Sequence, residues 1–434
     1  MTWKRFLSPA LALCAAVLLA ADTSTSTASP GPRSELNVRE FGAKGDGLTK
    51  DTAAIQKALD TCATNGGGTV LVPAGVYLTG SLMLGANTTL RLELRANLTG
   101  SPDIADYPLA RIRWEGEFAQ GHRALLSAEN SDHLTITGAG TITGPPAELS
   151  HLRNPRGPAL IEITEAKHVL LENFSTHYQG LWSIHLLFCQ NLTARDLTIR
   201  SAGVNGDGMD VDSCSDVLIE HCDINAGDDA ISLKSGRGQA AANLARPTQD
   251  VVIRNCILTS SQFAAVGIGS EMSAGIRRVR LENCTLTGHQ NGIFFKSRDG
   301  RGGVIEDVTG ENLIVNKSPT FVAVNLLNKG IQASDPVPGD IEKWAGLKNI
   351  TFKNIQVNQV GQLIAAANIP PEKPADGITF QNISGTCRKG IALANIVNAR
   401  LSGILVTGFE GPLLTRQNVT GTGLDNPATP ANLR

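Results

Sequence analysis

A six-residue pattern recurs along this chain in the order apolar, any, apolar, any, small or amide, apolar. Its copies begin 21 to 42 residues apart, at Leu134, Val169, Leu192, Val217, Val251, Val279, Val308, Ile350, Ile378 and Ala399. The alternation has the period of a β-strand, and a lone strand cannot bury such an apolar face. Parallel stacking buries the faces in one column, so the pattern predicts a β-solenoid, and its variable spacing excludes the stricter helical repeats.

Two positions of the repeat predict specific contacts. The fifth position is Asn in six of the ten copies, where an amide can bond to the same position of the next coil. Cys222, Cys256 and Cys284 hold the sixth, inward position, which predicts small buried hydrophobes and not disulfides. A disulfide is left open, with no pairing assigned, among the remaining cysteines Cys62, Cys189, Cys214 and Cys387.

The segment from Asp51 to Cys62 has apolar residues at helical spacing after an N-cap residue, Asp51. We expect a short amphipathic helix that covers the open N-terminal end of the stack. The 434-residue chain has a formal net charge of −2, with aromatic residues making up 4%. A balanced charge argues against a nucleic-acid partner, which would require a basic face.

The N-terminus has the features of an export signal. Lys4 and Arg5 precede an apolar stretch over residues 7–21, and Ser26 to Ala28 offers small residues for a peptidase. The prediction is a signal peptide at 1–28, a flexible lead-in at 29–35, a single β-helix domain at 36–425 and a tail at 426–434. We expect a secreted or periplasmic monomer with no membrane segment after signal removal.

Acidic residues crowd the stretch from Asn205 to Gly236, at Asp207, Asp210, Asp212, Asp228 and Asp229, with too few nearby cations to neutralise them. Any one of them could be a turn residue. Crowded carboxyl groups, however, can keep one member protonated beside an ionised neighbour, as cleavage of a glycosidic bond requires.

The repeat also places part of this cluster. Asp207 follows the copy at Leu192, whereas Asp228 and Asp229 follow the copy at Val217. Consecutive coils lie about 4.8 Å apart, so we expect the three carboxyl groups on one face of adjacent coils.

Three blocks then resemble the signatures of glycoside hydrolase family 28, the polygalacturonases and their relatives: Asn205 to Asp210, Ala226 to Gly236, and Ile268 to Met272. The segments Glu40 to Gly47 and Leu181 to Asn191 agree with this family, and the likeness covers about residues 36 to 410.

This resemblance implies an all-β, right-handed parallel β-helix that hydrolyses α-linked galacturonides in pectic polysaccharide with inversion, without metal or cofactor. It also implies that Asp228 is the general acid and that Asp207 and Asp229 activate the attacking water.

The chain departs from the family pattern twice. Gln262-Phe263-Ala264 stands where Gly-His-Gly is usual, and Phe294-Phe295-Lys296 where Arg-Ile-Lys is usual. An aromatic face suits a neutral sugar better than a carboxylate, so we hypothesise an uncharged sugar, such as rhamnose in rhamnogalacturonan, on the leaving-group side. The predicted substrate-binding residues are Asn205, Lys234, Phe263, Phe294 and Lys296.

Several side chains have alternative interpretations. Lys234 either touches substrate or balances the acidic cluster. Asp210 is expected to hydrogen-bond within its turn, or else to orient Asp207, and Asp212 to be a turn residue. Three histidines are expected to be structural and not catalytic: His177, His185 and His289.

Two other functions stay open. A non-catalytic pectin-binding β-helix is compatible with the missing His and Arg. A Ca²⁺-dependent pectate lyase would share the fold, although the Asp-rich stretch is no EF-hand because Asp216 stands at its twelfth position.

Overall fold

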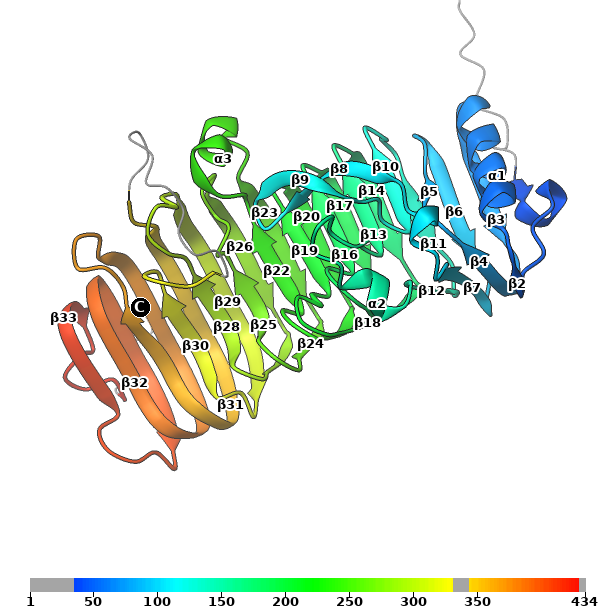
Figure 1. Ribbon diagram of the computed structural model, residues 1–434. Helices are drawn as coiled ribbons and strands as arrows, with labels where there is room; N and C mark the ends of the chain where they lie inside the picture. The colour runs from blue at the N-terminus through cyan, green and yellow to red at the C-terminus, as the bar shows by residue number, and fades with distance from the viewer. Residues whose placement is uncertain (1–34, 331–342, 429–434) are drawn as a thin grey trace, which may run out of the picture. The chain divides into compact units, whose positions relative to one another are not determined.

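The computed structural model describes residues 35–330 and 343–428. Its strands form parallel ladders that wind around a common apolar core, with each coil contributing one strand to each ladder (Figure 1). Among the strands of the described residues, pairing runs between coils, apart from one antiparallel hairpin. The predicted parallel β-helix is confirmed.

The first ladder carries the edge on which the acidic residues lie. Its strands are β5 (Leu82–Met83), β10 (Leu126–Glu129), β13 (Ile161–Thr164), β16 (Ile184–Leu187), β19 (Met209–Asp212), β22 (Ile231–Lys234), β25 (Ala264–Ile268), β28 (Asn291–Lys296) and β30 (Thr320–Asn325).

The second ladder holds the six-residue repeats. Its strands are β1 (Glu35–Asn37), β3 (Gly68–Val72), β6 (Thr88–Leu92), β11 (Thr135–Thr137), β14 (Lys167–Glu172), β17 (Gln190–Arg195), β20 (Ser215–Glu220), β23 (Thr248–Arg254), β26 (Ile276–Glu282) and β29 (Val304–Asn316).

The third ladder follows the corner after each repeat. Its strands are β2 (Asp46–Lys50), β4 (Gly75–Thr79), β7 (Ala96–Gly100), β12 (Thr141–Thr143), β15 (Ser175–Gln179), β18 (Thr198–Ala202), β21 (Asp223–Ala226), β24 (Ile257–Ser260) and β27 (Thr285–Gly288). Long strands that continue around the corners complete the C-terminal coils, namely β31 (Gly346–Asn368), β32 (Ala375–Thr407) and β33 (Leu414–Thr422).

The register of the second ladder follows the sequence repeat. Val169 pairs with Leu192, Leu192 with Val217, and the same position continues through Val251 and Val279. Side chains at the first and third positions point into the core because strand side chains alternate. The sixth position is also buried in every copy except the first, where Ala139 is exposed.

The fifth position has a backbone conformation that the sequence pattern did not reveal. All ten copies have a positive φ there, from 53° at His221 to 104° at Gly138. Asn, Asp and Gly tolerate this left-handed conformation, which explains why the position is small or an amide. The predicted amide contacts occur as well, since Asn312 donates to Asn283 over 3.2 Å and Asn382 to Asn354 over 3.2 Å.

Helix α1 (Thr52–Thr64) lies at the N-terminal end of the stack (Figure 1) and packs its apolar side, including Ile55 and Leu59, against the first coil. Asp51 stands at the predicted N-cap position, but its carboxylate does not cap the helix. It accepts hydrogen bonds from the backbone N–H groups of Lys44 (2.7 Å) and Gly45 (2.9 Å) instead. The capping prediction was therefore right in position and wrong in side-chain contact.

A few elements lie outside the coils. They are the 3-10 helices η1 (Val38–Phe41) and η2 (Ile104–Asp106), the helices α2 (Ala147–Ser150) and α3 (Gly238–Leu244), and the antiparallel hairpin of β8 (Leu109–Trp114) and β9 (Glu117–His122). None of the described helices is both long enough and apolar enough to span a membrane.

All cysteines in the described part of the chain are buried, and six of them form no disulfide, namely Cys189, Cys214, Cys222, Cys256, Cys284 and Cys387. Cys222, Cys256 and Cys284 line the core as predicted, and each is 1 or 2% exposed. The disulfide left open among the other four is absent from this structure. The predicted signal peptide and the end of the predicted tail lie outside the described residues.

Candidate active site

The acidic residues gather where two neighbouring coils enter the first ladder. Asp207 lies just before β19, and Asp228 and Asp229 lie just before β22. Because Met209 pairs with Ile231 and the N–H of Gly208 donates to the carbonyl oxygen of Asp229 over 3.0 Å, the two turns are adjacent. The structure thus brings the three carboxyl groups to one face, as the repeat predicted.

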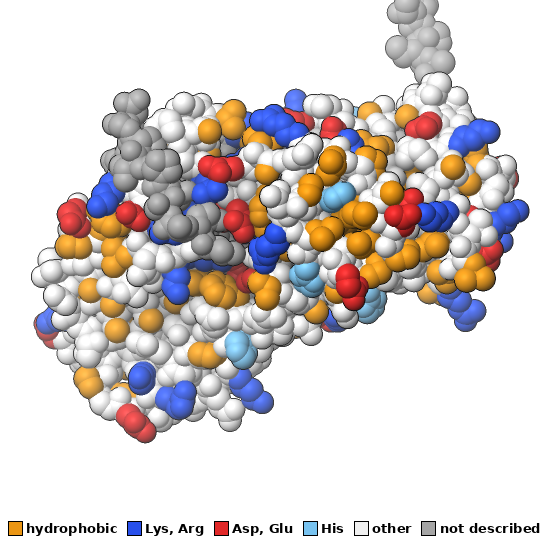
Figure 2. Space-filling model, in the orientation of Figure 1, with side chains coloured by type: hydrophobic (Ala, Val, Ile, Leu, Met, Phe, Trp, Pro, Cys, Tyr) orange, Lys and Arg blue, Asp and Glu red, His pale blue; other side chains and the backbone are white. Residues whose placement is uncertain are grey.

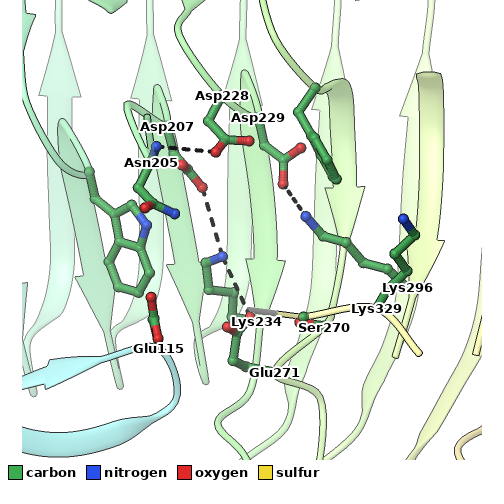
Figure 3. A pocket seen from close by; sticks show the side chains of 13 residues that line it. Glu115, Asn205, Asp207, Asp228, Asp229, Lys234, Ser270, Glu271, Lys296 and Lys329 are labelled. Carbon is green, nitrogen blue, oxygen red and sulfur yellow. Dashed lines mark hydrogen bonds and ion pairs between the residues drawn. The ribbon is translucent and has the colours of Figure 1, made fainter. Parts of the chain in front are cut away.

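The buried Lys234 and the partly buried Lys296 are interleaved with this cluster (Figure 3). Lys234 Nζ lies 3.8 Å from Asp207 Oδ2, 3.4 Å from Asp210 Oδ1 and 3.7 Å from Glu271 Oε2. The positive charge of Lys234 therefore offsets negative charges of the acidic cluster, as one of the two sequence-based interpretations of this residue predicted. Lys296 Nζ lies 2.7 Å from Asp229 Oδ2.

Asp228 differs from its two neighbours. Its Oδ2 accepts a hydrogen bond from the backbone N–H of Asn205 over 3.2 Å, and among the described residues no Lys or Arg forms an ion pair with it. Asn205 is held in turn by Arg153, whose Nη2 donates to Asn205 Oδ1 over 3.2 Å. Asp228 is also more exposed than Asp207 and Asp229, which are 3% and 1% exposed.

The crowding shifts the titration of the cluster. Burial, together with the charges of Asp210 and Asp228, raises the pKa of Asp207 well above its usual value. Burial and the neighbouring Asp229 raise the pKa of Asp228, and burial raises the pKa of Asp210 to about 6. The cluster can therefore retain a proton at a pH where an isolated carboxyl group is ionised.

A cleft of about 260 Å³ opens over these groups. Its lining includes seven of the eight residues predicted as catalytic or substrate-binding, which are Asn205, Asp207, Asp228, Asp229, Lys234, Phe263 and Lys296. The eighth, Phe294, is 4% exposed and does not line the cleft. Its ring packs behind Phe263, with 5.6 Å between the ring centroids.

Phe263 stands on the cleft wall beside a cation. The Nζ of Lys296 lies 4.6 Å from the centroid of its ring. The position where the family usually has His thus presents an aromatic ring, stacked on a lysine that already pairs with Asp229.

Sequence reasoning missed several lining residues, among them Glu115, Trp182, Ser270, Glu271 and Lys329. Ser270 and Glu271 lie in the Ile268 to Met272 block, which resembles a family signature. Their place in this block could have marked them as candidate site residues. Glu115 carried no such signal, because it reaches the cleft from the β8–β9 hairpin, nearly a hundred residues before the acidic cluster.

The interpretation of Asp210 and Asp212 as turn residues was wrong, since both lie within β19 and are fully buried. Asp210 faces Lys234, which agrees better with the alternative that it supports Asp207. Asp212 Oδ2 lies 3.3 Å from Arg113 Nε and 3.8 Å from His185 Nε2. Strand alternation points both carboxylates to one side, where cations cover them.

Of the three histidines, His185 lies where a structural residue is expected. His185 is fully buried, between Glu162 and Asp212. His177 and His289 are exposed and do not line the cleft. Among residues 35–330 and 343–428, no group of three or more His, Cys, Asp or Glu side chains is arranged to hold a metal ion.

Coupled carboxyl groups in an open cleft on a parallel β-helix define a class of protein, the glycosidases that act on polysaccharide chains. A family-wide sequence profile, "Glycosyl hydrolases family 28", matches residues 62–402. The chain therefore belongs to glycoside hydrolase family 28, and it is a polygalacturonase-type glycosidase acting on pectic galacturonan.

Proteins of similar sequence or structure support this family assignment. A probable polygalacturonase from Vitis vinifera is 30% identical over 367 residues, covering 80% of this chain and 73% of the relative. An endo-polygalacturonase from Pectobacterium carotovorum subsp. carotovorum is 26% identical over 425 residues, covering 91% and 98%. The solved structure of the Yersinia enterocolitica family 28 exopolygalacturonase shares the fold, with a TM-score of 0.79, 21% identity, and coverage of 90% of this chain and 78% of that one.

Proposed function

We propose that the chain cleaves α-galacturonosyl linkages by a single displacement that inverts the anomeric carbon. Asp228 donates its proton to the leaving oxygen as general acid, and Asp207 and Asp229 together accept a proton from the attacking water. The cleaved bond is the one between the anomeric carbon and the glycosidic oxygen, and the water oxygen replaces the leaving alcohol.

The distribution of lysines supports these roles. Asp207 and Asp229 each form an ion pair with a lysine, whereas Asp228 forms none among the described residues. Burial and the neighbouring Asp229 raise the pKa of Asp228, so this carboxyl group can carry a proton of the cluster at a pH where an isolated carboxyl group is ionised. Asp228 is also the most exposed of the three, as a group that meets the leaving oxygen must be.

The proposed mechanism can be tested by following the first product by proton NMR. Inversion releases the β-anomer before mutarotation, whereas the α-anomer as first product would disprove a single displacement. Asp228→Asn cannot donate the proton and should lower kcat by a factor of about 100 to 10,000. If Asp228→Asn kept the wild-type kcat, Asp228 would not be the general acid.

We further propose that the sugar on the leaving-group side is uncharged, as rhamnose is in rhamnogalacturonan. The Phe263 ring on the cleft wall supports this, because it offers an apolar face to a sugar. The pairing of Lys296 with Asp229 supports it also, because that lysine is already partly neutralised. Product analysis should show faster cleavage of rhamnogalacturonan I, and clearly faster cleavage of polygalacturonate would refute this preference.

We also propose, from the N-terminal sequence, that the protein is exported. Recovery of the mature chain outside the cytoplasm, with an N-terminus near residue 29, would support this. Intact Met1 on a cytoplasmic product would contradict it.

A further inference from the structure

The tip of the β8–β9 hairpin enters the cleft through Glu115. The hairpin loop consists of Glu115 and Gly116, with φ values of 48° and 84°. Two positive φ values in a two-residue loop define the turn that favours Asn-Gly. Glu in the first position is strained, because its Cβ crowds the backbone in this conformation. The chain thus holds a carboxylate at the cleft in a turn where Asn would fit better.

The hairpin tip is packed firmly against the edge of the cleft. The N–H of Arg237 donates to the carbonyl oxygen of Gly116 over 3.2 Å, and Arg237 Nη2 lies 2.6 Å from Glu117 Oε2. A Cβ on Gly116 would lie 2.9 Å from atoms of both Arg237 and Glu271. These contacts hold Glu115 in place at the cleft, where Figure 3 shows its side chain among those of the lining residues.

The strands of the hairpin fill the space beyond Glu115. Trp114 packs on Trp182 with 4.8 Å between ring centroids, and the guanidinium of Arg156 lies 4.4 Å from the first ring and 5.3 Å from the second. Trp182 and Arg156 are each 2% exposed. Among the described residues, the lining of the cleft on this side ends with Trp182 and Glu115.

The opposite side of the cleft has a different character. Phe263, Lys296 and Lys329 line it, on later coils than Trp182. With the leaving group on the Phe263 side, as proposed above, the sugar that is transferred to water lies toward Trp182 and Glu115. The far end of that sugar is its non-reducing end.

A carboxylate at this closed end is suited to a hydroxyl-bearing terminus. An ionised carboxylate accepts hydrogen bonds on both oxygens, and a terminal galacturonosyl unit offers free hydroxyls at C3 and C4. An internal unit has its O4 in a glycosidic bond, and the next sugar would collide with the hairpin.

We infer that Glu115 is a specificity-determining residue that binds the terminal hydroxyls of the non-reducing end, so that the enzyme removes sugar from chain ends. This inference rests on the proposed function, in particular on the side assigned to the leaving group.

The first test is the product profile on a pectic polymer that the wild type cleaves. We expect one short product from the earliest times, with viscosity falling slowly relative to the release of reducing ends. A ladder of long oligomers with a rapid fall in viscosity would overturn the inference. If the wild type cleaves no pectic substrate, the proposed function fails, and the role of Glu115 fails with it.

The second test compares two trigalacturonides, one saturated and one with a 4,5-unsaturated non-reducing end that lacks the O4 hydroxyl. Wild type should cleave the saturated one with a kcat/KM about tenfold higher, the effect of one hydrogen bond to a charged group. Glu115→Gln should lower kcat/KM for the saturated substrate and bring the ratio toward one.

Two further variants keep this test decisive. Glu115→Asn suits the turn, so it should fold at least as well as wild type and still lose the preference. Gln120→Ala changes an exposed side chain on β9 of the same hairpin and should leave the preference intact. An unchanged preference in both Glu115 variants, or an equal loss in Gln120→Ala, would overturn the assignment.

Discussion

The Nζ of Lys296 lies 2.7 Å from Oδ2 of Asp229, and the two side chains are 12% and 1% exposed. This nearly buried ion pair joins β28 to the turn before β22, two coils away. It ties the acidic cluster to the wall of the cleft that carries Phe263. Acidic and basic side chains are otherwise interspersed over the face shown in Figure 2.

Breaking this pair on one side should destabilise the protein. Lys296→Met leaves the buried carboxylate of Asp229 without its partner, and we expect the free energy of unfolding to fall by about 3 kcal/mol in urea titrations. The double variant Asp229→Asn with Lys296→Met should recover much of that loss while staying inactive. Strictly additive losses would show that the two groups do not interact.

Lys234 should control the acidic limb of the pH–activity profile. Its positive charge lowers the pKa of Asp207 against the larger raising effects of burial and Asp210. Removing the charge in Lys234→Met raises that pKa further, so Asp207 ionises only at higher pH. The acidic limb of kcat/KM should move to higher pH, with Lys353→Met as a remote control. A loss of activity that is equal at all pH values would contradict this role.

His185 should make stability depend on pH. Burial alone would lower its pKa, but Asp212 and Glu162 raise it from 6.5 to about 9. Because the folded-state value is the higher one, the stabilisation is complete below pH 6.5 and is lost as pH rises to about 9, on the order of 3 kcal/mol. Urea unfolding at pH 6 and pH 9 measures it, and His185→Gln should lose most of this difference. A wild-type stability that is flat over this range would disprove a charged His185.

The corner residues offer a test of what determines the fifth repeat position. Asn283 has φ 55° and accepts a hydrogen bond from Asn312 over 3.2 Å. Asn283→Ala should cost about 1 to 2 kcal/mol of unfolding free energy, because Ala is strained at positive φ. Asn283→Gly loses the same hydrogen bond without that strain and should cost less than Ala. Equal losses would mean that the amide contact, and not the backbone, sets the preference.

The sequence alone was enough for the stack and for the acidic face. The period-2 repeat specified which side chains face the core, and the interval between Asp207 and Asp228 placed them on adjacent coils. Both features could be predicted because each coil pairs only with its neighbours and repeats the same pairing, so a short stretch of sequence is sufficient to specify them. Asp210 and Asp212 were misplaced because Asp is common in turns, whereas here ion pairs with Lys234 and Arg113 keep both in a buried strand.

Only the tertiary structure decided which residues stand at the end of the cleft and which lysine pairs with which carboxylate. Glu115 reaches the site from a hairpin that lies outside the coils, so its place beside the acidic cluster depends on packing between distant parts of the chain. The same holds for the pairing of each lysine with its carboxylate, since a strand pattern gives the face of a side chain but not the neighbour it meets. The sequence thus determined the coil and the catalytic carboxyl groups that we propose, and long-range packing determined the end of the cleft.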